Sequence, residues 1–472
     1  MTELLGRTWA VLNRALEVYQ DNPRAGDWLR RHADRLTGPL RIAVAGQQKA
    51  GRSTLVNALV GEQVAPLELS DDAPGTVWYQ AGATPSATVF PHDEPPRELP
   101  AERVGGRLQV DLGPWRERPV DRIVVDWPAR SLRGTALLDT AGPPAMERLT
   151  DADAVVYLAQ HLHTSDVRLV QSLHENPLAM ASPVGVLLVL SRADEVGAGQ
   201  IDALFAARQL ARQHRREARI GAHCQDVIAV TGLLGYAGRT LRQAEFDALL
   251  VLAGTPRAEL DGHLLSADRF AGAVLPLGAE LRHALLDRLG LFGLRLATAL
   301  IRQGFDTHTK LCGQLVQRSG LTELRTAIGR YFTDRAEVLK ARSALIGLEV
   351  VLRREPRPPA VAMAAELEQI LAGAHDFREL RLLAALHAGA AVLPAELTAE
   401  ARTLIGGDGV SLSARLGLTD EELADPALRH AIVNALRRWR AHAENPVFDE
   451  DARAAAGTVV RSCEGMLANL PG

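Results

Sequence analysis

Apolar residues along the chain follow two different patterns, one of alternating strands and helices and one of helices alone. Helical stretches separate five short apolar runs typical of buried strands, at residues 41–47, 135–139, 154–160, 184–190 and 225–231. Strands that alternate with helices indicate a mostly parallel sheet covered on both faces. Between Pro66 and Pro128, alternating runs among prolines and glycines predict an irregular region with antiparallel hairpins.

Helical patterns occupy both ends of the chain. From Leu5 to Tyr19 the apolar residues step by three and four, which predicts an opening helix within a segment that ends at Gly38-Pro39. After residue 253 the strand pattern stops. A near-heptad stripe over residues 321–352 predicts one helix of about 30 residues, and three prolines end it. We therefore expect an α/β plus all-α chain in three parts, at residues 1–38, 39–255 and 256–472.

Composition excludes several classes of protein. At 472 residues the chain is longer than one hydrophobic core usually supports. The net charge of −4 comes from mixed basic and acidic residues, which argues against a nucleic-acid partner. Cys224, Cys312 and Cys463 form no CxxC motif, so neither a disulfide framework nor a zinc site is predicted. The opening residues do not resemble a signal peptide, and the longest apolar run, 382–393, is too short to span a membrane. We expect a cytoplasmic protein.

A phosphate-binding loop is predicted between the first strand and the helix that follows it. The eight residues match the pattern GxxxxG-[KR]-[ST], namely Gly46, Gln47, Gln48, Lys49, Ala50, Gly51, Arg52 and Ser53, and Thr54 follows them. Backbone N–H groups of such a loop, together with the helix N-terminus, cradle phosphates. Ser53 is placed to bind Mg²⁺. Lys49 either adds positive charge near the phosphates or is a solvated loop lysine.

Three further motifs follow strands in the order expected of a nucleotide switch protein. Asp139 and Gly142, in "DTAG", are candidates for the Mg²⁺ ligand and the γ-phosphate contact. Asp194, in "SRAD", is placed to accept hydrogen bonds from the N1–H and N2–H₂ groups of guanine, and the stem of Arg192 would lie over the base. Gly232, in "TGLL", closes the site. Together the motifs predict GTP or GDP and Mg²⁺ as ligands.

These motifs resemble the dynamin-like GTPases of bacteria, most closely the isoniazid-inducible type of actinobacteria. The resemblance covers almost the whole chain, including "GQQKAGRSTLVNALVGEQVAP", "LSRADEVGAGQID" and "LGLFGLRLATALIRQG". It implies a Ras-like P-loop GTPase domain at 39–255, an N-terminal helix at 1–38 that joins the neck, and a helical neck and trunk at 256–472. It also implies membrane remodelling or tethering driven by GTP.

The resemblance assigns roles and also reveals two departures. Gln48 matches the glutamine that positions the attacking water, and Ser53 and Asp139 match metal-binding residues. Arg52 replaces the phosphate lysine, and its planar, forked guanidinium does not fit a cradle shaped for an ammonium. In an ungapped alignment the switch I threonine falls on Ala73, although Thr76 would serve after a shift. Loss of one preorganised group costs roughly 10² to 10³ in rate, so we expect weak hydrolysis.

The resemblance also implies partners. We expect peripheral contact with an anionic membrane at its inner face, and either a homodimer through the GTPase domains or a hetero-oligomer with a dynamin-like paralogue. Two basic clusters are candidate membrane contacts, namely Arg353, Arg354 and Arg357, and Arg437, Arg438, Trp439 and Arg440. The favoured interpretation is that these clusters are solvated helix faces, with Trp439 and the run 382–393 packed inside the bundle.

Three other functions stay open at this point. The chain could be a nucleotide-binding adaptor that no longer hydrolyses GTP and acts with a more complete paralogue. A ribosome- or RNA-associated GTPase would need a basic tail, which the mixed charges of this chain do not supply. The third alternative is a scaffold that binds no nucleotide.

Overall fold

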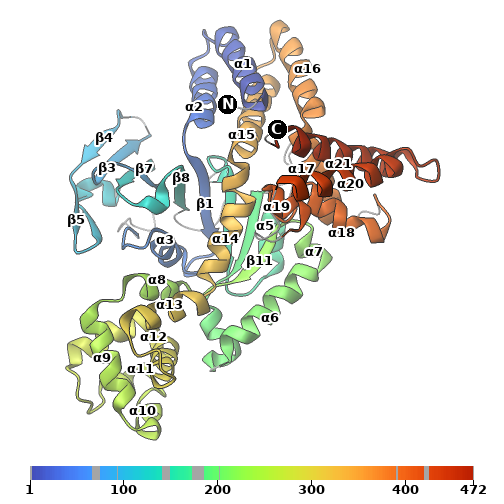
Figure 1. The fold of residues 1–472 in the computed structure, drawn as a ribbon. Helices are drawn as coiled ribbons and strands as arrows, with labels where there is room; N and C mark the ends of the chain where they lie inside the picture. Colours follow the sequence, from blue (N-terminus) through green and yellow to red (C-terminus); the bar gives the residue numbers. More distant parts are fainter. Residues whose placement is uncertain are drawn as a thin grey trace.

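A nine-stranded sheet forms the centre of the protein (Figure 1), whose computed structural model describes residues 3–65, 75–92, 94–140, 149–172, 185–200, 202–387, 389, 392–418 and 425–470. The strand order is β11-β10-β9-β1-β8-β2-β7-β3-β4. The bounds are β1 Leu40–Gly46, β2 Thr76–Ala81, β3 Ser86–Pro91, β4 Arg97–Leu99, β7 Val120–Trp127, β8 Thr135–Thr140, β9 Ala154–Ala159, β10 Val186–Leu190 and β11 Asp226–Ala229.

The pairing of these strands confirms a mixed, mostly parallel sheet. β1 runs parallel to β8 and β9, and β10 runs parallel to β9 and β11. β2 is antiparallel to β8, and β3 is antiparallel to β7 and β4. A separate hairpin pairs β5 (Ala101–Val104) with β6 (Arg107–Val110). The irregular region between Pro66 and Pro128 therefore contains the antiparallel pairs predicted for it.

The two faces of the sheet belong to two different cores. Side chains alternate along β1, so Ile42 and Val44 join one core, whereas Ala43 and Ala45 join the other. Helices α3 (Arg52–Val60), α5 (Thr164–Ser172), α6 (Ala203–Arg216) and α7 (Ala218–Gly221) follow strands of the sheet. Burial on both faces explains why the central strands read as continuous apolar runs.

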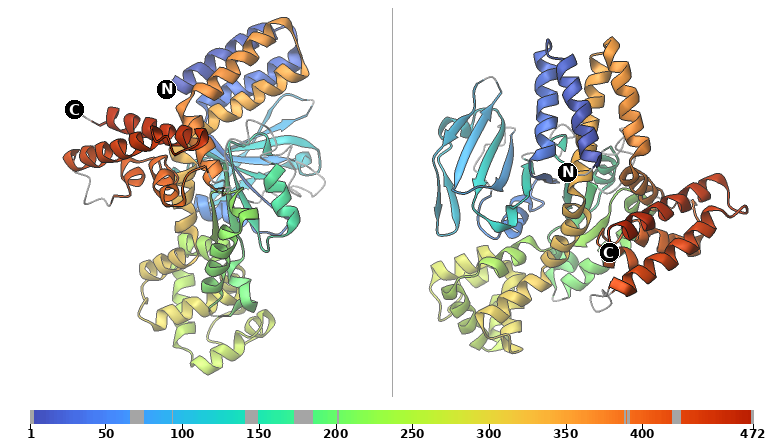
Figure 2. Two further views of the ribbon diagram at one scale, coloured as in Figure 1. Left: turned by 90° about the vertical axis from the view of Figure 1, so that its right-hand side faces the viewer. Right: turned by 45° about the horizontal axis from the view of Figure 1, so that its top comes forward.

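Helices outside the sheet form three groups (Figures 1 and 2). A four-helix bundle contains α1 (Glu3–Val18), α2 (Pro23–Thr37), α15 (Ala336–Arg354) and α16 (Pro358–Gly373). A lower lobe contains α8 (Gly232–Thr240), α9 (Gln243–Gly254), α10 (Arg257–His263), α11 (Ala267–Ala271), α12 (Ala279–Arg302) and α13 (His308–Arg318). The C-terminal bundle contains α17 (His375–His387), α18 (Ala395–Leu404), α19 (Leu412–Leu416), α20 (Asp425–Ala443) and α21 (Glu450–Ala468).

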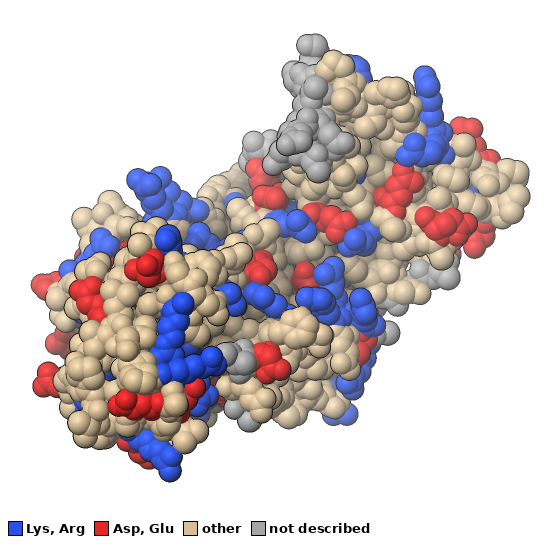
Figure 3. Space-filling model, turned by 60° about the horizontal axis from the view of Figure 1, so that its bottom comes forward, with Lys and Arg blue, Asp and Glu red and all other residues tan. Residues whose placement is uncertain are grey.

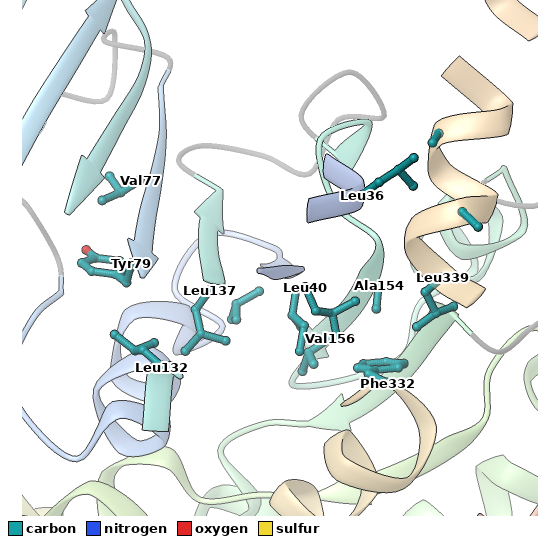
Figure 4. Packing of buried hydrophobic residues seen from close by; sticks show 14 of the residues in the cluster. Leu36, Leu40, Val77, Tyr79, Leu132, Leu137, Ala154, Val156, Phe332 and Leu339 are labelled. Atoms are coloured by element: carbon teal, nitrogen blue, oxygen red, sulfur yellow. The ribbon is translucent and has the colours of Figure 1, made fainter. Parts of the chain in front are cut away.

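The sheet and the four-helix bundle share one apolar core. Figure 4 shows Leu137 and Val156 of the sheet in the same packed region as Leu36 of α2 and Leu339 of α15. Phe332, which precedes α15, lies in the same core and is fully buried. A shift of the bundle against the sheet would therefore disturb close packing, which resists gradual deformation.

The predicted single helix over residues 321–352 is wrong. Helix α14 (Leu321–Tyr331) ends before a 3-10 turn at Thr333–Arg335, and α15 begins at Ala336. Arg335 in that turn is buried and its guanidinium donates to the carbonyl of Gly406 in the C-terminal bundle. Burial lowers the pKa of Arg335 to about 10. The break between α14 and α15 thus coincides with the contact of the buried Arg335 with the C-terminal bundle.

Residues 3–37 form two helices instead of one. Asn22 lies between them, and its side-chain oxygen accepts from the backbone N–H of Ala25 at the start of α2. Pro23 occupies the first helical position, where its missing N–H costs nothing. This cap-and-proline pair is the usual sequence signal for a helix start.

A buried carboxylate joins the bundle to the sheet. The Asp153 cluster consists of Asp153, just before β9, with Arg35 of α2, Arg342 of α15 and the backbone N–H of Arg41 in β1. Arg35 Nε lies 3.0 Å from Asp153 Oδ1, and both side chains are almost fully buried. The Arg41 N–H donates to Asp153 Oδ2 at 2.9 Å. Burial lowers the pKa of Arg342 to about 10, and Asp153 opposes that shift.

A second buried carboxylate, Glu379, predicts acid sensitivity of the C-terminal bundle. Burial alone would raise its pKa, but hydrogen bonds from His375, Arg415 and Ser462 outweigh that effect and lower the pKa from 4.5 to about 2. Arg415 Nη2 donates at 2.9 Å and Ser462 Oγ at 2.7 Å. The stabilisation is therefore complete above the unfolded-state pKa and is lost as pH falls from 4.5 toward about 2.

We expect this loss to reach roughly 3 kcal/mol. Thermal unfolding of the C-terminal bundle, followed by circular dichroism across that pH range, measures it. The Glu379→Gln variant should unfold more easily at neutral pH and show a shallower acid dependence. An acid dependence as steep in the variant as in the parent would contradict the assignment to Glu379.

Candidate functional site

The loop between β1 and α3 has the backbone that a phosphate cradle requires. Gly46 has φ of 151°, and a Cβ there would lie 2.3 Å from the carbonyl oxygen of Leu158. Lys49 and Gly51 also have positive φ, at 64° and 90°. Helix α3 begins at Arg52, so its free N–H groups face the loop. The predicted strand, loop and helix are all present.

The two predicted metal-binding residues lie in contact. Ser53 Oγ donates to Asp139 Oδ2 at 2.8 Å, which joins the start of α3 to the end of β8. Burial raises the pKa of Asp139, while the Ser53 hydrogen bond and the charge of Arg52 oppose that shift. A hydroxyl and a carboxylate are hard oxygen ligands that suit Mg²⁺, which usually takes its other ligands from substrate phosphates and water. The described residues contain no group of three or more His, Cys, Asp or Glu that could hold a metal.

Arg52 contacts the beginning of switch II, the segment that starts with Asp139 in the "DTAG" motif. Its Nη1 donates to the carbonyl oxygen of Thr140, the last residue of β8. The buried Thr76 starts β2 and pairs in register with Thr140. Thr76 therefore lies beside switch II, where a shifted switch I threonine would be needed. Two predicted positions, Ala73 and Gly142, lie outside the described residues.

A pocket of about 240 Å³ opens beside this loop. It is lined by the remaining motif residues from three different elements, namely Ala50, Gly51, Thr54, Ser191, Arg192, Asp194 and Gly232. Leu158, Val189 and Val230 provide apolar walls. Burial raises the pKa of Asp194. The structure thus brings the predicted base-reading residues to one side of the predicted phosphate loop.

Arg192 is fixed in a position that fits its predicted place beside the base. It has φ of 51°, and its Nε donates to the carbonyl of Lys49 at 3.1 Å. Its Nη1 lies 2.8 Å from Glu195 Oε1. These contacts tie the segment after β10 to the phosphate loop. Gln48 and Lys49, in the same loop, have exposed side chains.

Sequence reasoning missed a buried network under the phosphate loop. Asp166 of α5 is 1% exposed. Its carboxylate accepts from Gln47 Nε2 at 2.9 Å, from the Tyr157 hydroxyl at 2.7 Å and from the His163 N–H at 2.9 Å. The side chain of Gln47 is thus engaged with Asp166, although the sequence assigned Gln47 to nucleotide contact. An acidic residue in a helix's first turn was the available signal, and it commonly marks only a cap.

Comparison with known proteins places the chain in a family. No protein-family model matches it. The isoniazid-induced protein IniC of Mycobacterium tuberculosis, in strains CDC 1551 / Oshkosh and H37Rv, is 37% identical over 487 aligned positions that cover 98% of each chain. The chain belongs to the IniC family of dynamin-like proteins. The resemblance inferred from the motifs is confirmed.

Solved structures were also compared with this IniC-family chain. Two chains from an oligomerised bacterial dynamin pair, described as a mechanism for long-range sensing and tethering of membranes, align with TM-scores of 0.30 and 0.32. They are 11% and 14% identical, and the alignments cover 78% and 82% of this chain and 78% and 72% of those chains. Scores this low carry no argument about function.

The sequence candidates for membrane contact in the IniC-family chain are mostly engaged within the protein. Trp439 is fully buried, and the apolar side chains Leu382, Leu383, Leu386 and Leu393 belong to the C-terminal core. Arg438 pairs with Glu400 and Arg440 with Glu464. In the described part of the chain, no helix is long and apolar enough to cross a membrane. The favoured interpretation of Trp439 and of the apolar run, as bundle core, is confirmed.

Proposed function

We propose that this protein binds GTP and GDP with Mg²⁺ and hydrolyses GTP slowly. The proposal rests on one observation. Asp194 lines a pocket with Gly51 and Thr54, and Ser53, beside Thr54 at the start of α3, contacts Asp139. A base-reading carboxylate, a phosphate loop and a pair of oxygen ligands for Mg²⁺ thus adjoin one another. Membership of a dynamin-like family supports the same activity.

Each residue has a defined role in this proposal. The carboxylate of Asp194 accepts from the guanine edge, and the loop from Gly46 to Gly51 donates backbone N–H groups to phosphate oxygens. Ser53 and Asp139 would hold Mg²⁺, which supplies charge stabilisation of the phosphates when bound. Gln48, whose side chain is exposed, would orient the attacking water. Asp166 fixes the loop from below through Gln47.

Hydrolysis is expected to be slow because of Arg52. The guanidinium donates to the carbonyl of Thr140 instead of presenting a compact ammonium to the phosphates. This contact also favours a second candidate function, a nucleotide-binding adaptor that depends on a more complete dynamin-like paralogue for hydrolysis. The two candidates differ in turnover and agree in binding.

We further propose that the protein acts peripherally at the inner face of the cell membrane. It would assemble through its GTPase domains, as a homodimer or with a dynamin-like paralogue, to remodel or tether that membrane. The domains would be the N-terminal helices at 1–38, the GTPase domain at 39–255 and the neck and trunk at 256–472. Family membership supports this proposal, as does the shared core that links sheet and bundle.

Removing the Asp139 carboxylate should strongly reduce turnover. We expect Asp139→Ala to lower the steady-state rate of GTP hydrolysis by about 10² to 10³, because a preorganised oxygen ligand at the phosphates is lost. Phosphate release, measured over a range of protein concentrations, reports the rate. Asp261→Ala, which removes an exposed carboxylate in the lower lobe, is the control and should leave the rate unchanged. Equal, negligible rates in parent and variant, with GTP binding retained, would select the adaptor.

A further inference from the structure

A second pocket lies in the four-helix bundle, between α2 and α15. Its volume is about 340 Å³, within the range of small-molecule sites. Helix α2 runs into β1 at its C-terminal end, so the end that starts at Pro23 is the one directed away from the sheet (Figures 1 and 2). The pocket is lined by Arg24, Ala25, Trp28, Arg31, Val350, Val351, Arg354 and Glu355.

The cations around this pocket differ from the other cations on the same helices. Five of the eight Lys and Arg residues on α2 and α15 interact with acidic groups or carbonyls, namely Arg30 with Asp27, Arg35 and Arg342 with Asp153, Lys340 with the carbonyls of Leu36 and Gly38, and Arg353 with Glu349. The side chains of Arg24, Arg31 and Arg354 make no ion pair or hydrogen bond with any residue that the structure describes. All three are exposed, and all three line the pocket.

The pocket floor is apolar and held in place. Trp28 is half-buried, and its indole N–H donates to the carbonyl of Gly347 at 2.9 Å. Ala25, Val350 and Val351 complete the apolar lining. A cationic rim above an apolar floor with tryptophan suits an amphiphile that has an anionic head.

We propose that this pocket binds one anionic phospholipid. The phosphate would lie among the guanidiniums of Arg24, Arg31 and Arg354, and the glycerol end of the acyl chains would lie on Trp28. Glu355 is the one acidic group in the lining, so the side-chain charge of the pocket is plus two. That charge and the small volume match a single phosphate better than an acidic peptide or a polyanion.

The face of the protein drawn in Figure 3 has mixed charge, unlike the basic pocket. On the face drawn in Figure 3, basic and acidic side chains are interspersed over the lower lobe and the neighbouring helices. Such a face has little long-range attraction for an anionic membrane. The inference rests on the membrane part of the proposed function, and it locates a lipid contact in the bundle instead of the C-terminal helices.

Vesicle binding tests the pocket directly. The full-length protein is mixed with vesicles of equal parts phosphatidylglycerol and phosphatidylcholine, or of phosphatidylcholine alone, and bound protein is measured by flotation. The pocket variant Arg24→Gln/Arg31→Gln/Arg354→Gln should bind the anionic vesicles about 10- to 100-fold more weakly than the parent. Soluble glycerol phosphate, a headgroup without acyl chains, should compete only weakly.

A matched variant removes the same charge from the same bundle. Arg14→Gln/Arg30→Gln/Arg353→Gln removes three exposed guanidiniums that form ion pairs outside the pocket, and this variant should bind vesicles like the parent. If both triple variants lose affinity equally, the attraction depends only on net charge and the pocket proposal fails. Equally strong binding in all three proteins, or none in the parent, would also overturn it.

Tryptophan fluorescence adds a local readout. Phosphatidylglycerol with brominated acyl chains should quench part of the emission, and Trp28→Phe should remove that quenched part. Quenching that persists in Trp28→Phe would place the lipid elsewhere. GTP binding is measured on the same protein preparations without vesicles, so that the two proposals can fail separately. If the protein binds vesicles through the three arginines but does not bind GTP, the proposed GTPase function fails and the lipid site stands.

Discussion

Replacing Asp153 by alanine is expected to lower the free energy of unfolding by about 3–5 kcal/mol. The change leaves the buried guanidinium of Arg35 without the carboxylate it pairs with, and it removes the attraction of Asp153 for Arg342. It also removes the acceptor of the Arg41 N–H at the start of the sheet. Urea unfolding followed by circular dichroism measures the change as a lower midpoint.

The matched control for this prediction lies on the same bundle. Asp27 also pairs with an arginine of α2, but its side chain is 62% exposed, so Asp27→Ala should cost at most about 1 kcal/mol. A midpoint for Asp153→Ala that equals that of Asp27→Ala would mean that the buried cluster contributes no more than a surface pair. The Asp153→Asn variant isolates charge from shape and should lie between the parent and the alanine variant.

Changing Asp194 to asparagine should redirect nucleotide selectivity. The carboxylate accepts two hydrogen bonds from guanine, whereas an amide accepts one and presents a donor to the other, so we expect GTP affinity to fall by about 10² to 10⁴. Xanthosine triphosphate carries a carbonyl oxygen where guanine has its N2 amino group, so it can accept from the asparagine amide and should bind the variant better than GTP does. Titration calorimetry with both nucleotides measures the exchange.

Glu195→Gln provides the comparison for Asp194→Asn. Glu195 also lines the pocket, and its carboxylate contacts Arg192. Glutamine keeps an oxygen that can accept from Arg192, so Glu195→Gln should change GTP affinity little. Unchanged GTP affinity in Asp194→Asn would show that this carboxylate does not read the base. Loss of both GTP and xanthosine triphosphate binding would indicate a collapsed pocket instead of a changed preference.

The nucleotide pocket was predictable because parallel strands place their carboxyl ends at one edge. Asp139 and Asp194 each lie at or after the end of a strand, so spacing alone brought them toward the loop at Gly46. The fold class followed from the same periodicities. The break before α15 did not, because the apolar stripe continues through it and only the contact of Arg335 with Gly406 accompanies it.

Buried charges were the other feature that sequence patterns did not reveal. Asp153 and Asp166 are both buried, although acidic side chains are rarely fully buried without partners. Their partners, Arg35 and Gln47, come from distant parts of the chain. The cluster of Arg353, Arg354 and Arg357 was considered for membrane contact. Only the fold shows that Arg353 and Arg357 form ion pairs, whereas Arg354 forms none with the residues that the structure describes.

The four-helix bundle can be completed only late in synthesis, because its helices come from distant parts of the chain. Helices α1 and α2 are made before their partners α15 and α16, which begin about 300 residues after α2 ends. At roughly 5–20 residues per second, this interval lasts about fifteen seconds to one minute. Throughout it, α1 and α2 can pack only on each other, and their apolar residues, such as Leu12 and Leu29, are not yet covered by α15 and α16. We therefore expect this helix pair to present an apolar surface for chaperones to bind until α15 and α16 are made.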